Sequence, residues 1–137
     1  MESITIAHSE RNMMYTVAKE FNFSASHRLE HLPETHPCFR LHGHNYVVEL
    51  ILRAEELDPT GFVIDYRALE PFKHIIDDEL DHRHLNDILP GITSAECLSR
   101  WLFDRAEQLW PTLVYAVRVS ETPKTWAEYR PSSTLKA

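Results

Sequence analysis

Residues 42–53 read His-Gly-His-Asn-Tyr-Val-Val-Glu-Leu-Ile-Leu-Arg, an alternation that predicts a β-strand with one apolar face. Residues 13–26 show the same period of two, with an interruption at Lys19, and His27 continues that parity at the end of the stretch. We therefore expect two half-buried strands that share one core. The face of the second strand would carry His42, His44, Tyr46, Val48, Leu50 and Leu52.

The pattern changes after the predicted turn at residues 58–61. Apolar residues at helical spacing predict a first helix, formed by Leu69, Phe72, Ile75, Ile76 and Leu80. Ser94 is a plausible N-cap of a second helix that would bury Leu98, Trp101, Leu102 and Leu109, with Cys97 as a small core residue.

Two further strands are expected near the C-terminus. Residues 113–121 alternate, with Leu113, Tyr115, Val117 and Val119 on one face, and residues 126–130 form a short last strand. The order β-β-α-α-β-β predicts an α+β fold, in which both helices cover one face of an antiparallel sheet. An exposed sheet edge on so small a unit favours assembly with copies of itself.

Length and composition narrow the class of protein. The 137 residues predict one domain over 1–137, with a core at about 14–130 and frayed termini. A net charge of −7 argues against general binding to nucleic acid, and any polyanionic ligand must meet a local basic pocket. No apolar stretch predicts a membrane span or a secretory signal, so we expect a cytoplasmic protein with reduced cysteines.

Eight of the nine histidines fall between positions 27 and 84. His42 and His44 are two residues apart in a predicted strand, which sends both imidazoles to one face. If the two long strands pair, His27 supplies a third nitrogen, and three imidazoles with an open fourth position are typical of a catalytic zinc. The alternative is that these are hydrogen-bonded surface histidines.

Cys38 and the Asp81-His82 pair are candidates for proton transfer. Cys38 lies four residues before His42, where it could be a fourth zinc ligand or, as a thiolate, a general base. An aspartate that accepts a hydrogen bond from one ring nitrogen raises the basicity of the other, so His82 is a candidate proton carrier. The alternative for this pair is a polar helix C-terminus.

Glu121 is the one carboxylate on the apolar parity of its strand, so it needs a ligand or a basic partner. A zinc hydrolase would require a carboxylate near the metal to activate water. We expect none to lie beside the His-x-His strand, which counts against that class.

Four blocks together resemble the family of 6-pyruvoyl-tetrahydropterin and 6-carboxy-tetrahydropterin synthases, over about residues 14 to 130. They are Phe23-Ser-Ala-Ser-His-Arg-Leu29, Cys38-Phe-Arg-Leu-His-Gly-His-Asn-Tyr46, Leu80-Asp-His-Arg-His-Leu-Asn86 and Ser120-Glu-Thr-Pro123. The resemblance implies a tunnelling fold, in which protomer sheets join into a barrel. It also implies a homohexamer of two trimers with active sites between subunits.

The resemblance implies a role for each matching residue. His27, His42 and His44 are similar to the zinc ligands, Cys38 to the catalytic cysteine, and Asp81 with His82 to the proton-transferring pair. The same resemblance makes Glu121 the carboxylate that anchors the pterin ring. Glu96 and Ser94 occupy further positions implicated in pterin contact, Ser94 where the family more often has threonine.

The spacing Cys-x3-His-Gly-His resembles the bacterial 6-carboxy-tetrahydropterin synthases of the queuosine and 7-deazapurine route, although the cysteines that some members carry after the anchoring glutamate are absent. A zinc-dependent lyase is implied, which converts 7,8-dihydroneopterin triphosphate to 6-carboxy-5,6,7,8-tetrahydropterin, triphosphate and acetaldehyde. The alternatives are 6-pyruvoyl-tetrahydropterin synthase activity on the same substrate, or a non-catalytic zinc-binding assembly protein.

Overall fold

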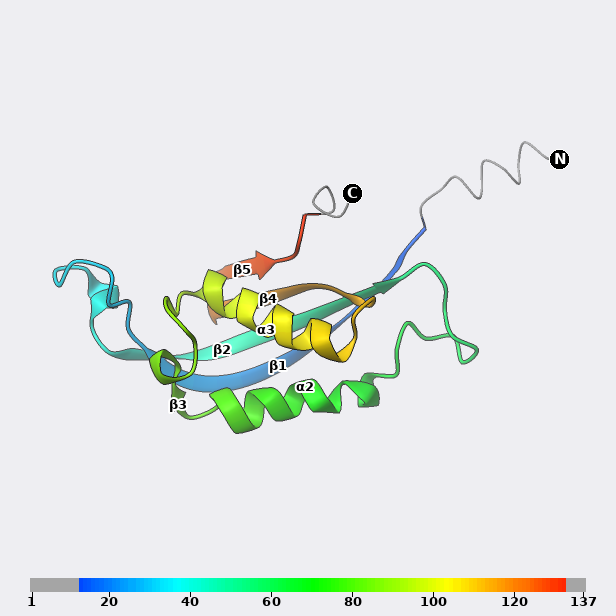
Figure 1. The fold of residues 1–137 in the computed structure, drawn as a ribbon, viewed down its shortest axis with the longest axis horizontal. Helices are drawn as coiled ribbons and strands as arrows, with labels where there is room; N and C mark the ends of the chain where they lie inside the picture. Colours follow the sequence, from blue (N-terminus) through cyan, green and yellow to red (C-terminus); the bar gives the residue numbers. More distant parts are fainter. Residues whose placement is uncertain (1–12, 133–137) are drawn as a thin grey trace.

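Two long antiparallel strands form the centre of this computed structural model, which describes residues 13–132. Strands β1 (Tyr15–His27) and β2 (His42–Ala54) have thirteen residues each and pair along their whole length, from Tyr15 opposite Ala54 to His27 opposite His42 (Figure 1). The predicted frayed termini lie mostly outside the described residues.

The predicted alternation accounts for the core. Phe21, Phe23, Ala25 and His27 of β1 are buried, and so are Tyr46, Val48, Leu50 and Leu52 of β2. Both sets point to the face that the helices cover, and the residues between them on β1 are exposed or half-buried on the other face. Because side chains alternate between the two faces of a strand, His27, the last residue of β1, lies on the same buried face as Phe21 and Phe23.

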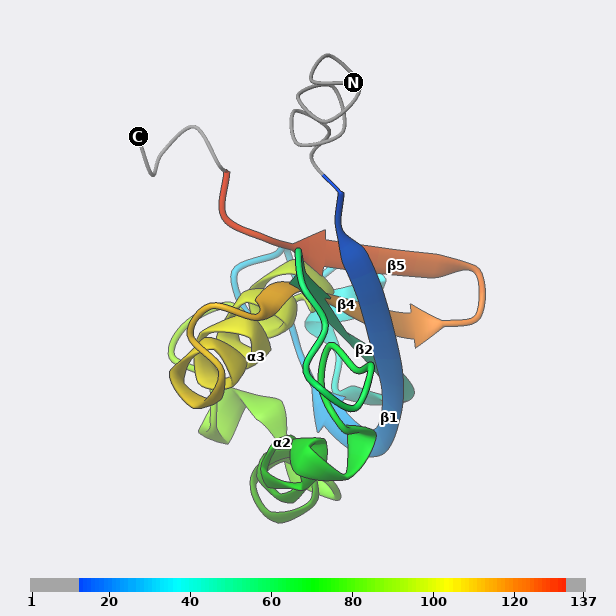
Figure 2. The same ribbon diagram turned by 90° about the vertical axis from the view of Figure 1, so that its right-hand side faces the viewer.

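The helices α2 (Glu70–Ile75) and α3 (Ala95–Leu109) lie on one side of the sheet, as predicted (Figures 1 and 2). A 3-10 turn (Tyr66–Leu69) precedes α2 and a π-helical turn (Ile76–Leu80) follows it. Ser94 caps α3, since its side chain accepts a hydrogen bond from the backbone N–H of Cys97. Two burial predictions for this helix are wrong: Cys97 is exposed, and Leu109 is 39% exposed.

Strands β4 (Val114–Thr122) and β5 (Thr125–Tyr129) extend the sheet beyond β2. Val117 and Val119 are fully buried, as expected, but the predicted parity fails at Tyr115. The register shifts there, with Ile51 opposite Ala116 and Leu52 opposite Val114. This irregularity turns Tyr115 toward the guanidinium group of Arg53, 3.5 Å from its ring centroid, and leaves Val114 to pack on the core.

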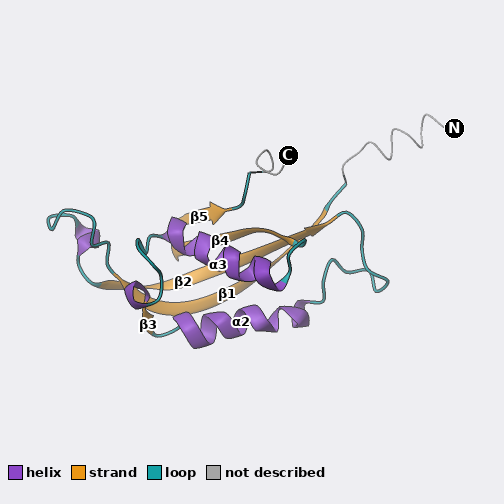
Figure 3. Ribbon diagram, in the orientation of Figure 1, coloured by secondary structure: helices purple, strands orange, loops and turns teal. Residues whose placement is uncertain are grey.

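A short strand that the sequence analysis did not predict makes the sheet mixed rather than purely antiparallel. Strand β3 (Arg83–His84) pairs parallel with β1 at Ala25 and Ser26, so the strand order is β3-β1-β2-β4-β5 (Figure 3). It follows His82, whose φ of 59° is the one positive φ of a non-glycine residue among residues 13–132. No helix within that range is long and apolar enough to cross a membrane.

Candidate metal centre

Three imidazole rings converge where β1 ends and β2 begins. The ring centroids lie 4.5 Å apart for His27 and His42, 4.9 Å for His42 and His44, and 5.1 Å for His27 and His44. One nitrogen from each ring lies within 4.8 Å of the other two. The strand register produces this arrangement, because it sets His27 directly opposite His42.

Backbone carbonyls fix which nitrogen of two rings is available. His27 Nδ1 lies 2.7 Å from the carbonyl oxygen of Thr93, and His42 Nδ1 lies 2.7 Å from that of Arg40. A carbonyl only accepts hydrogen bonds, so each Nδ1 carries the proton and each Nε2 keeps its lone pair. In metal sites, a histidine ligand commonly donates its second N–H in this way.

The donor set fits a divalent metal ion. His27 is 1% exposed, and its Nε2 is buried with no hydrogen-bond partner in the described part of the chain. Burial lowers the pKa of His27 below its ordinary value of 6.5, against the opposing effect of the Thr93 carbonyl. Burial likewise lowers the pKa of His44, although the charge of Glu121 opposes it. Neutral imidazoles with free lone pairs are the form that binds zinc.

A carboxylate from β4 reaches the same cluster. Glu121 Oε2 lies 3.5 Å from His27 Nε2 and 3.6 Å from His44 Nε2. The expectation that no carboxylate would lie near these histidines is therefore wrong, because β4 is the neighbour of β2 in the sheet. Tyr46 lies fully buried beside His44, and burial, with a smaller contribution from Glu121, raises the pKa of its phenol far above the usual 10.

Asp81 and His82 form a second cluster. Asp81 Oδ2 lies 3.0 Å from His82 Nδ1, and Asp81 Oδ1 accepts a hydrogen bond from the backbone N–H of Ser24 at 2.9 Å. That backbone bond, followed in effect by the bond to His82, lowers the pKa of Asp81 below 3.8. The predicted hydrogen-bonded geometry of this pair is present.

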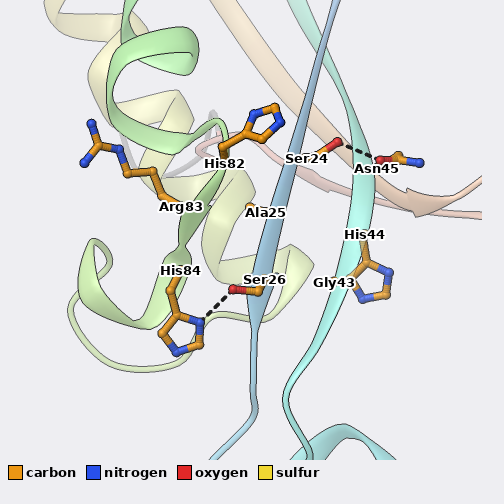
Figure 4. Close-up of a pocket in the computed structure, with 9 residues that line it drawn as sticks. All are labelled: Ser24, Ala25, Ser26, Gly43, His44, Asn45, His82, Arg83 and His84. Carbon is orange, nitrogen blue, oxygen red and sulfur yellow. Dashed lines mark hydrogen bonds between the residues drawn. The ribbon is translucent and has the colours of Figure 1, made fainter.

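His82 lines a pocket of about 480 Å³ together with Ser24, Ser26 and Asn45, and the metal-cluster residue His44 also lines it (Figure 4). The pocket therefore lies next to the metal cluster, with residues of both parities in its lining. No hydrogen bond, ion pair or ring contact joins His82 to the three histidines within residues 13–132.

The remaining predicted site residues are linked to the histidines through the backbone. Cys38 is half-buried in a 3-10 turn (Pro37–Phe39), and its carbonyl accepts a hydrogen bond from the backbone N–H of Leu29, two residues beyond His27. Its thiol is not one of the clustered ligand atoms. Ser94 and Glu96 open helix α3, directly after Thr93, whose carbonyl holds the His27 ring.

Two positioning residues were missed in the sequence. Thr93 holds His27, and Asn86 pins the residue after His27 by accepting from the Arg28 backbone N–H at 2.9 Å and donating to its carbonyl at 2.8 Å. Asn86 ends the Leu80–Asn86 block, so its place in that motif was a signal. Thr93 offered none, because it acts through its backbone carbonyl.

An α+β fold with three convergent imidazoles at one end of its sheet defines a protein with a candidate metal-binding site. The chain belongs to the 6-pyruvoyl tetrahydropterin synthase family, whose model matches residues 16–132. The predicted family and the tunnelling fold are thus confirmed.

Relatives carry the names of two related synthases. A 6-carboxy-5,6,7,8-tetrahydropterin synthase of Synechocystis is 32% identical over 123 residues, which cover 85% of this chain and 93% of the relative. A 6-pyruvoyl tetrahydrobiopterin synthase of Dictyostelium discoideum is 32% identical over 124 residues, covering 79% and 90%. The structure of Caenorhabditis elegans 6-pyruvoyl tetrahydropterin synthase is similar with a TM-score of 0.78 and 31% identity, over 89% of this chain and 99% of that one.

Proposed function

We propose that this protein is a zinc-dependent lyase that converts 7,8-dihydroneopterin triphosphate to 6-carboxy-5,6,7,8-tetrahydropterin, and that it serves the queuosine and 7-deazapurine route. The reaction would release triphosphate and acetaldehyde. The observation that carries the proposal is the convergence of three imidazoles, one with a buried Nε2 that has no hydrogen-bond partner within residues 13–132, in a chain whose relatives are pterin synthases.

Each residue of the site has a part in this reaction. Zinc bound by His27, His42 and His44 would supply a Lewis acid for the side-chain hydroxyls of the substrate. Cys38, as a thiolate, would remove a proton from the side-chain carbon. His82, held by Asp81, would carry protons during elimination and carbon–carbon cleavage.

The pterin ring would be held by other residues. The Glu121 carboxylate can accept two hydrogen bonds, from the exocyclic amino group and the adjacent ring N–H. Ser94 and Glu96 would add contacts from the start of α3, which lies beside His27 through Thr93.

A complete site would need more than one copy of the chain. His82 shares a pocket with His44, but no hydrogen bond, ion pair or ring contact joins it to His27, His42 or His44 within residues 13–132. A homohexamer of two trimers, with sites between subunits, would bring the two clusters together. Mixing inactive Cys38→Ala and His82→Ala proteins tests this: shared sites regain activity in mixed oligomers, whereas sites complete within one chain stay inactive.

The reaction itself is tested by incubating the zinc-loaded protein with 7,8-dihydroneopterin triphosphate and identifying the products by mass spectrometry. Acetaldehyde together with the 6-carboxy product would support the proposal. A 6-pyruvoyl product without acetaldehyde would favour the alternative activity, which the Dictyostelium relative also represents.

A non-catalytic role is separated by Cys38→Ala. We expect this variant to keep its zinc, since the Cys38 thiol lies outside the cluster of ligand atoms, and to lose turnover. An assembly protein would show no turnover in either form.

A further inference from the structure

Arg28 directly follows His27, and hydrogen bonds hold its backbone on both sides. Asn86 accepts from the Arg28 backbone N–H at 2.9 Å and donates to the Arg28 carbonyl at 2.8 Å. The Thr93 hydroxyl donates to the same carbonyl at 3.4 Å. Since both backbone groups of Arg28 are bonded, its half-buried side chain starts from a fixed point at the end of β1.

The Arg28 side chain reaches the turn that carries Cys38. Its Nε donates a hydrogen bond to the carbonyl of Phe39 at 3.1 Å, and its guanidinium carbon lies 4.6 Å from the centroid of the Phe39 ring. The next residue, Leu29, donates its backbone N–H to the carbonyl of Cys38 at 2.9 Å. Two consecutive residues after His27 thus bind two consecutive carbonyls of the Cys38 turn.

The hydrogen bonds inside the turn do a different job. His36 Nδ1 accepts from the Cys38 backbone N–H at 3.0 Å, and the His36 carbonyl accepts from the Phe39 N–H at 3.0 Å. These bonds shape the turn, because both of their partners belong to it. Besides the covalent link into β2, Arg28 and Leu29 supply the hydrogen bonds between this turn and the end of β1.

We propose that Arg28 is a positioning residue, which holds the Cys38 turn against the end of β1 through the hydrogen bond from its Nε to Phe39. The proposal rests on the proposed function, in which the Cys38 thiolate removes a proton from the substrate. Proton removal depends on where the base lies, and a misplacement of about 1 Å can slow a reaction about a hundredfold. This role depends chiefly on a donor at the Nε position, whereas an arginine that binds the triphosphate of the substrate depends on its charge.

Three substitutions separate these two roles. Arg28→Gln puts an amide nitrogen at the place of Nε, so it keeps a donor and removes the charge. Arg28→Lys keeps the charge and puts a methylene group at that place, and Arg28→Met removes both. Arg100→Met is the control, because Arg100 is an exposed residue of α3 whose guanidinium carbon lies 5.3 Å from the ring centroid of Tyr129. Circular dichroism establishes that each variant is folded, and Arg28→Lys carries the comparison if Arg28→Met is not.

The first measurement needs no turnover. Amide hydrogen exchange, followed by mass spectrometry of peptides that cover residues 28–40, reports how often the turn opens. We expect exchange at least about tenfold faster in Arg28→Met and Arg28→Lys, and within about threefold of the unchanged protein in Arg28→Gln and Arg100→Met. Exchange that is unaffected in both Arg28→Met and Arg28→Lys would overturn the proposal.

The second measurement is turnover of 7,8-dihydroneopterin triphosphate by the zinc-loaded proteins. We expect kcat to fall at least about tenfold in Arg28→Met and Arg28→Lys with KM within about threefold, and both constants of Arg28→Gln to stay within about threefold. The reverse order, with Arg28→Lys active and Arg28→Gln impaired chiefly in KM, would overturn the proposal, because it would assign Arg28 to the triphosphate. An unchanged protein without turnover, together with faster exchange in Arg28→Met, would reject the proposed reaction and leave the assignment of Arg28 to the Cys38 turn standing.

Discussion

Asp81→Asn should destabilise the protein by about 1–2 kcal/mol. The carboxylate serves two donors, the Ser24 backbone N–H at 2.9 Å and the His82 ring at 3.0 Å, one on each oxygen. An asparagine has a single, uncharged carbonyl oxygen, so the Ser24 N–H and the His82 ring can no longer each bond to a carboxylate oxygen. Hydrogen bonds to charged groups contribute about 1.5–3 kcal/mol, and we take the lower part of that range because the Asp81 side chain is 32% exposed to water.

Guanidinium unfolding of the metal-free protein, followed by circular dichroism at one protein concentration, measures the difference. Because the Ser24 amide lowers the pKa of Asp81 below 3.8, the carboxylate stabilises the fold above that pH and loses its effect as the pH falls through its native pKa. The gap between the two proteins should therefore close in acid. Asp104→Asn, at an exposed position of α3, is the control. A loss at pH 7 within about 0.5 kcal/mol, the range of ordinary surface substitutions, would refute the reasoning.

Three further outcomes are expected. Zinc affinity should fall as the pH drops below 6.5, because protons then compete with the metal for His27 and His44, whose pKa values burial lowers below that value. A chelator competition assay measures this, and equal affinity above and below pH 6.5 would contradict the prediction. Gly43→Ala should weaken zinc binding about tenfold, because the added Cβ would lie 3.2 Å from the Ala25 carbonyl oxygen and push β1 and β2 apart between His42 and His44. Calorimetry measures the change, and unchanged zinc binding would contradict this prediction. Leu50→Ala, at a fully buried position, should cost about 2–5 kcal/mol in guanidinium unfolding, and a loss below about 1 kcal/mol would show that the core repacks.

The parts of the fold that follow from local periodicity were predictable. The alternation of apolar residues predicted which face of β1 and β2 is buried, including Phe23 and Tyr46. Ser94, a serine directly before a helical pattern, predicted the N-cap of α3. The convergence of the histidines needed only one further assumption, that the two strands pair, because parity then places all three rings on one face.

The parts that depend on long-range geometry were not predictable. Strand β3 has two residues, too few to show any period, and exists because Asp81 and His82 bind Ser24. Tyr115 left its expected face because the register shifts beside Leu52, which no local pattern records. Glu121 was singled out by its parity, but its closeness to His27 depends on which strand lies beside β2.

Because β1 pairs with β2 along its whole length, the ability to bind a metal ion would depend on the correct register between these two strands. A slip of one residue would turn one strand's histidines to the opposite face, and a slip of two would carry His27 about 7 Å along the ladder from His42. Neither misaligned hairpin could gather three rings around one ion. If zinc binds there as proposed, the zinc stoichiometry of a preparation would measure the fraction of molecules that reached the correct alignment, and zinc present during folding would favour that alignment.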